Sequence, residues 1–359
     1  QSGVIKDAFV EYATKRVPVE LRANFLPTGD GLESIVIRVQ ERENHSYNLK
    51  NIGLLPFQQQ MIEHLIRTPA GLALINGKTG SGKNTTLIAM IEEYGRIFPD
   101  RARLTAEDPV EIRVHGVTQL SIIEQGENRQ ATLRSYEKGI LRHDPELIVI
   151  GEVRDRVAAE MVVESANLGH LVMTTLHTEN SIKAITRLLD LDIPRYKVES
   201  VLKYSIAQRL VRRICTECEI VEDDQLPDLP RLQEYIELTK FKSDKPFVRA
   251  TGRDKYGRDC GRCGGARFYG RIGIFEILRV SNAIRELIYQ GASLNAIRVQ
   301  ALADGFRSMW SVGLERALNG ETTLGEIVEN LGYPDPDTEG LPITAQPDAE
   351  FTTETEFSH

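Results

Sequence analysis

The stretch INGKTGSGKNTTL, residues 75–87, decides the fold. It nearly matches the phosphate-binding pattern G-x-x-x-x-G-K-[ST]. The apolar run at 71–76 predicts a buried strand, and 84–98 has the spacing of a helix. A strand, a glycine loop and a helix in this order surround phosphate oxygens with backbone N–H groups and the positive end of a helix dipole. The predicted nucleotide-binding residues are Gly77, Thr79, Gly80, Ser81, Gly82, Lys83, Asn84 and Thr85.

One residue of this loop departs from the pattern. Asn84 stands where Ser or Thr normally supplies the hydroxyl that holds magnesium. Magnesium accepts a carboxamide oxygen, but Asn is longer than Thr and brings an NH₂ group that must point away from the metal. Thr85 and Thr86 are rotated by about 100° and 200° around the helix and cannot simply substitute. We expect weakened magnesium coordination, retained nucleotide binding and residual hydrolysis. The alternative is binding without turnover.

Composition and charge are those of an ordinary globular protein. The 359 residues are enough for two or three domains, and the net charge of −8 argues against a broad, non-specific grip on nucleic acid. No window approaches 18 apolar residues, and no signal-peptide pattern is present. Because the chain starts at Gln1, we expect a fragment of a longer protein, whose membrane role, if any, goes through a partner or a missing segment.

The middle of the chain alternates apolar runs with helical stretches. Runs at 103–108, 146–152 and 170–177 predict buried strands, which favours a mostly parallel sheet with helices on both faces. Gly95 is expected to interrupt the helix after the phosphate loop. The predicted regions are strands of an N-terminal domain at 1–45, a core at 46–210, a cysteine-containing subdomain at 211–275, a helical subdomain at 276–335 and a disordered tail at 336–359.

Titratable residues follow these predicted strands. The segment EDPVE, residues 107–111, follows the first strand and Glu152 follows the second, where Gly151 replaces a common Asp. A carboxylate at such a place can orient or deprotonate an attacking water. His170 and His177 flank the third strand; the carboxyl end faces the site, so His177 is favoured as a donor to a terminal phosphate. The alternatives are solvated loop carboxylates and a histidine satisfied at a strand end.

The four cysteines form two C-x-x-C pairs. Cys215 and Cys218 make the first pair, Cys260 and Cys263 the second, and 41 residues separate the pairs. In a chain without a secretory signal this pattern indicates a metal site before disulfides. Four thiolates complete a tetrahedral shell, so we predict a structural zinc ion. Four free thiols or a redox pair are the alternatives.

Together these motifs resemble those of the hexameric ATPases that drive type II secretion and type IV pilus assembly. The resemblance covers roughly residues 18–332, through GKTGSGKNTTL, AEDPVEI, ILRHDPELIVIGEVRD, GHLVMTTLHTENS, AQRLVRRIC and GARFYGRIGIFEIL. It implies an α/β fold with a RecA-like P-loop ATPase core. It also implies the end of a small PAS-like α/β domain before the core, with a zinc-binding subdomain and a helical subdomain after it.

The resemblance assigns roles to the acidic and histidine motifs. EDPVE is similar to the family's Asp box, in which Glu111 or Glu107 polarises the attacking water. GEVRD is similar to its Walker B motif, where glycine before Glu152 is normal. GHLVMTTLHT is similar to its His box, which again favours His177.

The resemblance also implies cofactors and partners. These are ATP, Mg²⁺ and Zn²⁺, a homohexameric ring and an inner-membrane platform protein, with no direct nucleic-acid contact and membrane contact only through partners. The location would be cytoplasmic and peripheral at the inner membrane. Arg22 and Arg38 match arginines that reach a nucleotide, where they can neutralise transition-state charge; the alternative is surface charge on a strand.

Within the family, a tetracysteine element is typical of assembly and secretion members rather than of retraction motors. Two other functions remain open. A conjugation or DNA-translocating ATPase of the same superfamily would need a basic pore, which the net charge of −8 does not favour. A nucleotide-binding subunit impaired in hydrolysis would follow from Asn84.

Overall fold

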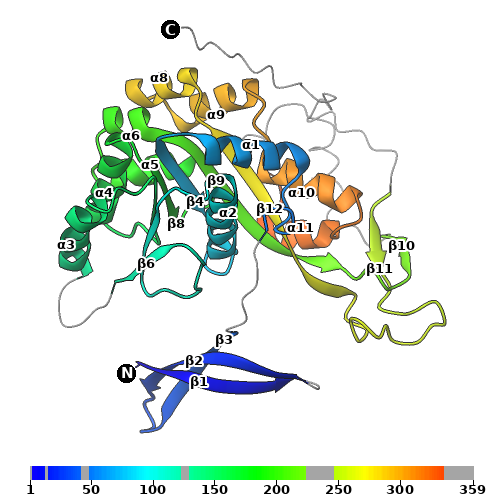
Figure 1. Cartoon of the computed structure of the whole chain (residues 1–359). Helices are drawn as coiled ribbons and strands as arrows, with labels where there is room; N and C mark the ends of the chain where they lie inside the picture. The colour runs from blue at the N-terminus through cyan, green and yellow to red at the C-terminus, as the bar shows by residue number, and fades with distance from the viewer. Residues whose placement is uncertain (1, 13–14, 42–47, 123–128, 224–245, 335–359) are drawn as a thin grey trace.

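A seven-stranded sheet forms the centre of the computed structural model, which describes residues 2–12, 15–41, 48–122, 129–223 and 246–334 (Figure 1). Its strand order is β12-β9-β4-β8-β7-β5-β6. All neighbouring pairs are parallel except β12 on β9, so the predicted α/β fold with a mostly parallel sheet is confirmed. The strands are β4 (Gly71–Asn76), β5 (Arg103–Glu107), β6 (Thr118–Ser121), β7 (Leu147–Ile150), β8 (Leu171–Leu176), β9 (Leu202–Ile214) and β12 (Phe268–Arg279).

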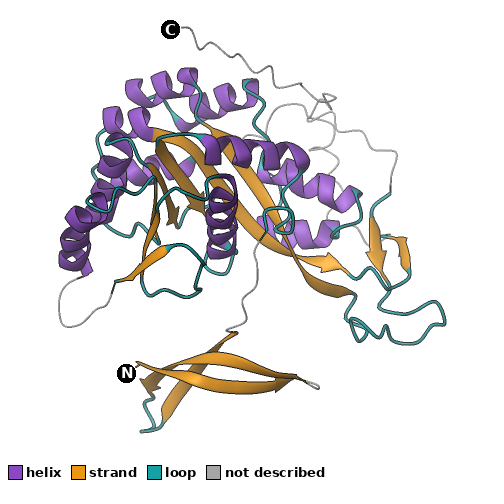
Figure 2. Cartoon of the chain, viewed as in Figure 1, coloured by secondary structure: helices purple, strands orange, loops and turns teal. Residues whose placement is uncertain are grey.

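Helices cover both faces of this sheet (Figures 1 and 2). On β4, Leu72 and Leu74 join one hydrophobic core while Ala73 and Ile75 join the other, because successive side chains point to opposite faces. A strand buried on both faces is therefore apolar throughout. One face carries α1 (Pro56–Arg67) and α2 (Lys83–Ile97). The other carries α3 (Arg129–Leu141), α4 (Arg156–Asn167), α5 (Lys183–Asp190), α6 (Arg195–Val201), α8 (Asn282–Gln290) and α9 (Leu294–Ala303).

The long strands β9 and β12 form an antiparallel ribbon that runs beyond the other strands (Figure 1). Helices α10 (Met309–Leu318) and α11 (Leu324–Leu331) pack on it through a third core. Past the ribbon lie the cysteines and the strand pair β10 (Ile220–Glu222) and β11 (Val248–Ala250). The predicted domain boundaries at 210 and 275 fall inside β9 and β12, so one sheet crosses both; the division into domains stays a prediction.

The N-terminal strands form a separate antiparallel sheet in the order β1-β2-β3. They are β1 (Ser2–Tyr12), β2 (Lys15–Pro27) and β3 (Glu33–Glu41). Arg22 and Arg38 are paired across β2 and β3. The predicted tail at 336–359 and most of the insert between the cysteine pairs, 224–245, lie outside the described residues.

The expected interruption at Gly95 is wrong. Helix α2 continues through this residue to Ile97. A Cβ placed on Gly95 would lie 1.7 Å from Nη1 of Arg103, so glycine leaves room for the first residue of β5. Glycine therefore marks a close packing contact here and not the end of a helix.

A buried carboxylate joins α11 to the ribbon. The backbone N–H of Arg212 donates to Oε2 of Glu326 at 2.9 Å, and its guanidinium Nε donates to Oε1 at 2.8 Å. Glu326 is 3% exposed. Burial acts to raise the pKa of Glu326, but the hydrogen bonds and the charge of Arg212 outweigh it and hold this pKa below its usual value.

Glu326→Gln should therefore lower the free energy of unfolding near neutral pH by about 1.5–3 kcal/mol, the usual contribution of a hydrogen bond to a charged group. A depressed folded-state pKa gives stability that is present above the unfolded pKa and is lost as pH falls through the folded pKa. The gap between parent and variant should then narrow below about pH 4. Urea unfolding across this pH range measures the difference, with Glu160→Gln as control, because Glu160 on α4 is paired with Arg156 at the surface. A gap that stays constant with pH would contradict the assignment.

Candidate active site

The carboxyl ends of four adjacent parallel strands meet at one edge of the sheet. β4 leads into the loop 77–82, β5 ends at Glu107, β7 is followed by Gly151 and Glu152, and β8 is followed by His177. A cavity of about 610 Å³ lies at this edge, where open α/β sheets bind their ligands. Of the predicted nucleotide-binding residues, it is lined by Thr79, Gly80, Ser81, Gly82, Lys83, Asn84 and Thr85.

The loop is shaped by its glycines. Gly80 and Gly82 have φ of 78° and 86°, a left-handed conformation that favours glycine. Gly77 lies behind the loop, where a Cβ would meet Oγ of Ser81 at 2.4 Å. Its carbonyl oxygen accepts a hydrogen bond from Nζ of Lys83 at 2.8 Å. Burial lowers the pKa of Lys83, so a negative phosphate beside it would restore the charged form.

Glu152 connects the ends of two strands. Its Oε1 lies 2.9 Å from Nε2 of His177, and its Oε2 accepts a hydrogen bond from Nε of Arg154 at 2.8 Å. Nη1 of Arg154 lies 3.7 Å from Oδ2 of Asp108, just past β5. The Walker-B-like carboxylate, the histidine and the acidic loop are therefore held in one network. In contrast, His170 lies before β8, with Nδ1 2.7 Å from the carbonyl oxygen of Pro145.

The second acidic cluster includes the unusual Asn84. Its Nδ2 donates to Oε2 of Glu111 at 2.9 Å. An ionised carboxylate only accepts hydrogen bonds, so the NH₂ end must face Glu111 and the carbonyl oxygen is left as the possible magnesium ligand. Glu107 is held differently: its Oε1 accepts hydrogen bonds from Oγ1 of Thr105 at 2.6 Å and Nε2 of Gln119 at 3.0 Å. Both candidate carboxylates line the cavity.

Several residues that line the cavity were not predicted from the sequence. Arg154 and Arg271 stand inside recognised motifs, but neither was singled out. Thr175 lines the cavity and donates through Oγ1 to the carbonyl oxygen of Gly151 at 2.7 Å. Gln119 comes from β6, a strand of four residues that no apolar run marks. Arg22 and Arg38 lie at paired positions on β2 and β3, and their role stays a prediction.

The cysteines gather at the end of the ribbon, and their geometry fits zinc. All four Sγ atoms lie within 4.8 Å of one another. Sγ of Cys215 is 3.8 Å from that of Cys260, and Sγ of Cys218 is 3.4 Å from that of Cys263. Four Zn–S bonds of about 2.3 Å in a tetrahedron place the sulfurs about 3.8 Å apart. Four thiolates leave no open position, as in a structural site.

The pKa values of the thiols differ within this cluster. Burial raises the pKa of Cys215 and of Cys218. Backbone N–H groups of Cys263 and Arg262 lower the pKa of Cys260 to about 7. Hydrogen bonds that favour a thiolate also suit a metal ligand.

Within the described segments, no helix combines the length and the hydrophobicity that crossing a bilayer requires.

Known proteins share both the sequence pattern and the fold. The family model "Type II/IV secretion system protein" matches residues 6–329. Type II secretion system protein HxcR of Pseudomonas aeruginosa is 34% identical over 87% of this chain and 59% of its own length. Type IV pilus assembly ATPase PilB of Thermus thermophilus is 34% identical over 90% of this chain and 34% of its own length. Type II secretion system ATPase E of Vibrio cholerae is 33% identical over 89% and 63%.

Two solved structures support the fold alone. The pilus retraction motor PilT with bound ADP aligns with a TM-score of 0.61 and 24% identity, over 93% of this chain and 78% of its own. The ATPase DotB of Legionella pneumophila gives 0.59 and 20%, over 90% and 76%. The chain thus spans a third to two thirds of the length of these three curated relatives.

Proposed function

The chain belongs to the Type II/IV secretion system protein family, and we propose that it is a motor ATPase that powers type IV pilus assembly or type II secretion. One observation carries the proposal. The glycine loop, the Glu152–His177 pair and the Asn84–Glu111 pair converge on one cavity at the carboxyl edge of the sheet. The relatives include secretion and pilus assembly ATPases, and their names support a role in pilus assembly or secretion.

Each residue then has a chemical role in ATP hydrolysis. The N–H groups of the loop and the start of α2 bind phosphate oxygens, and Lys83 adds a positive charge. Glu111 or Glu107 orients the attacking water and takes its proton. His177, fixed by Glu152, donates a hydrogen bond to the terminal phosphate. The carbonyl oxygen of Asn84 would hold Mg²⁺, which neutralises charge on the phosphates when bound.

The finer parts of the proposal concern assembly and place. We place the chain in a homohexamer in the cytoplasm, at the inner membrane, moving a platform protein of a pilus or secretion machine. Arg22 and Arg38, paired across β2 and β3, would reach a nucleotide in that assembly. The cysteine cluster fits a zinc-containing assembly or secretion member, and zinc there would be structural.

ATP turnover by the parent chain tests this function. We expect magnesium-dependent hydrolysis that a fragment of the platform protein stimulates and that duplex DNA leaves unchanged. Stimulation by DNA alone would instead favour a DNA-translocating ATPase. ATP binding without turnover under all conditions would favour a subunit impaired by Asn84.

Asn84→Thr should lower the magnesium concentration for half-maximal turnover about tenfold, within the range seen when metal-binding shells are altered. The change restores a hydroxyl at the usual ligand position and removes the hydrogen bond to Glu111. A magnesium titration of ATPase activity measures this. The control is Asn319→Thr, the same change at the residue that follows the last residue of α10, away from the phosphate loop. An unchanged or higher magnesium requirement in Asn84→Thr would show that the carboxamide is not a poor ligand.

A further inference from the structure

A chain of buried hydrogen bonds starts at the phosphate loop. Asn76 is the last residue of β4, directly before Gly77, and its Nδ2 donates to Oγ of Ser205 at 2.8 Å. Oγ of Ser205 donates to the carbonyl oxygen of Ser181 at 2.7 Å. Asn76, Ser205 and Ser181 are all 0% exposed. Hydrogen bonds shielded from water in this way fix the groups that they join.

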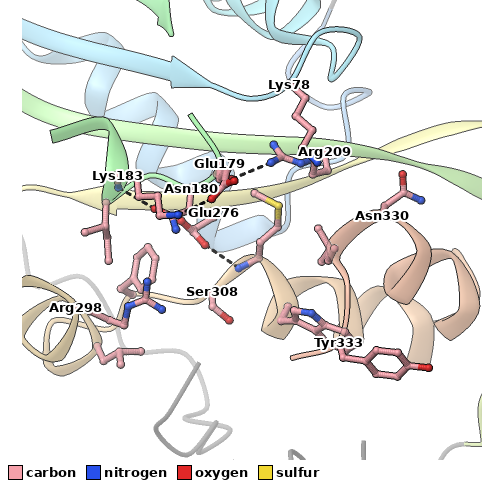
Figure 3. A pocket seen from close by; sticks show the side chains of 16 residues that line it. Lys78, Glu179, Asn180, Lys183, Arg209, Glu276, Arg298, Ser308, Asn330 and Tyr333 are labelled. Atoms are coloured by element: carbon pink, nitrogen blue, oxygen red, sulfur yellow. Dashed lines mark hydrogen bonds and ion pairs between the residues drawn. The ribbon is translucent and has the colours of Figure 1, made fainter. Parts of the chain in front are cut away.

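The chain continues to the helical layer through Glu276 on β12. The backbone N–H and Oγ of Ser181 donate to Oε1 of Glu276 at 2.8 and 2.6 Å. The other oxygen, Oε2, accepts a hydrogen bond from the backbone N–H of Met309 at 3.1 Å (Figure 3). Met309 is the first residue of α10, so the carboxylate also lies at the positive end of that helix.

Glu276 is a buried carboxylate, and the groups around it satisfy both of its oxygens. It is 5% exposed and accepts three hydrogen bonds. Arg209 and Glu276 both line a second cavity, apart from the one at the phosphate loop. Burial lowers the pKa of Arg209, while the charge of Glu276 acts to raise it. Removing the carboxylate would leave the buried donors of Ser181 and Met309 without their acceptor, which is costly.

The hydrogen bonds of Glu276 lie beside this second cavity (Figure 3). The cavity has a volume of about 460 Å³ and lies between the segment that follows β8 and helices α9 to α11. Glu179, Asn180 and Lys183 form one wall, and Ser308 and Asn330 lie on the helical side. Since the space between these walls is open, side-chain packing does not fill this seam. The contact of Glu276 with Ser181 and Met309 bridges it.

The same segment carries the candidate catalytic histidine. His177 and Ser181 are four residues apart, and His177 contacts Glu152 at 2.9 Å. We propose that Glu276 is a positioning residue, which holds the loop 177–182 against α10 and thereby keeps His177 in contact with Glu152. Through Asn76 and Ser205, it also couples the phosphate loop to the helical layer. Its effect on turnover rests on the proposed ATPase function, but its effect on the order of the loop does not.

Glu276→Gln tests this role because it preserves shape but replaces one accepting oxygen by an NH₂ donor. Hydrogen exchange of the full chain without nucleotide should be about tenfold faster in residues 177–182 and at the start of α10. Turnover should fall tenfold or more, with KM for ATP within about threefold of the parent, because misplacement of a catalytic group affects the transition state most.

Glu329→Gln is the matched control. It makes the same chemical change on α11, but its side chain is 69% exposed. Ser205→Ala is a second variant, which removes one hydroxyl between Asn76 and Ser181 and should reproduce the faster exchange even if Glu276→Gln fails to fold. Exchange in 177–182 equal to that of the parent in the folded variants would overturn the proposal. A parent chain without ATPase activity would refute the proposed function and leave the exchange result decisive for Glu276.

Discussion

Glu152→Gln should lower kcat for ATP hydrolysis about 10³-fold while leaving nucleotide affinity nearly unchanged. The carboxylate accepts a hydrogen bond from Nε of Arg154 and lies 2.9 Å from Nε2 of His177. The amide of glutamine has the same shape but only one accepting oxygen and no charge. It would therefore release or turn the imidazole of His177. The phosphate loop, which is made by other residues, would still bind ATP.

Single-turnover ATPase assays and nucleotide binding, measured on the same samples, separate these two effects. Glu160→Gln is the matched control, because Glu160 lies on the exposed side of α4 and pairs with Arg156 at 2.7 Å. It should keep the activity of the parent. Turnover of Glu152→Gln within threefold of the parent would remove Glu152 from the catalytic set.

The features that local sequence determines were predicted well. The loop after β4 needs glycines with positive φ and a lysine at fixed spacing, so seven consecutive letters place the phosphate site. β4, β5, β7 and β8 are short apolar runs because both faces of the sheet are covered, and their carboxyl ends bring Glu107, Glu152 and His177 together.

The features that depend on distant pairing were not predicted. β9 and β12 pair through residues such as Gln208 and Phe275. The stretch KYSIAQRLVRRI, residues 203–214, has no regular alternation of polar and apolar residues that would indicate a strand. Arg271 reaches the cavity only because β12 pairs with β9. Glu276 stands in a recognised motif, but its role depends on contacts with Ser181 and Met309, 95 and 33 residues away in the sequence.

The contact between Asn84 and Glu111 was not predicted from the sequence. From the sequence, the NH₂ group had only to avoid the metal. In the structure it donates to Glu111, one of the two residues predicted to polarise the attacking water. The departure from Ser or Thr therefore links the predicted magnesium ligand to a candidate base, and a change at Asn84 should alter both.

Removal of zinc should unfold the lobe beyond the ribbon and leave the sheet intact. Among the described residues of this lobe the apolar cluster is small, and its buried members are Ile214, Cys215, Cys218, Ala250 and Cys260. A core of this size cannot hold a fold without a metal, and binding of structural zinc supplies about 10–16 kcal/mol in small zinc domains at neutral pH. The main sheet has its own, much larger cores.

Cys215→Ser, or a strong chelator, should therefore increase hydrogen exchange at least 100-fold in residues 215–222 and 248–267, with little change in β4 and β8. Elemental analysis of the parent should give one zinc ion per chain. Thr216→Ala, in the same C-x-x-C turn, is the control and should keep its zinc, because the hydroxyl only meets Nη1 of Arg262 at 3.4 Å. If the metal-free lobe exchanges as slowly as the parent, the four thiols hold this lobe together through packing and hydrogen bonds alone.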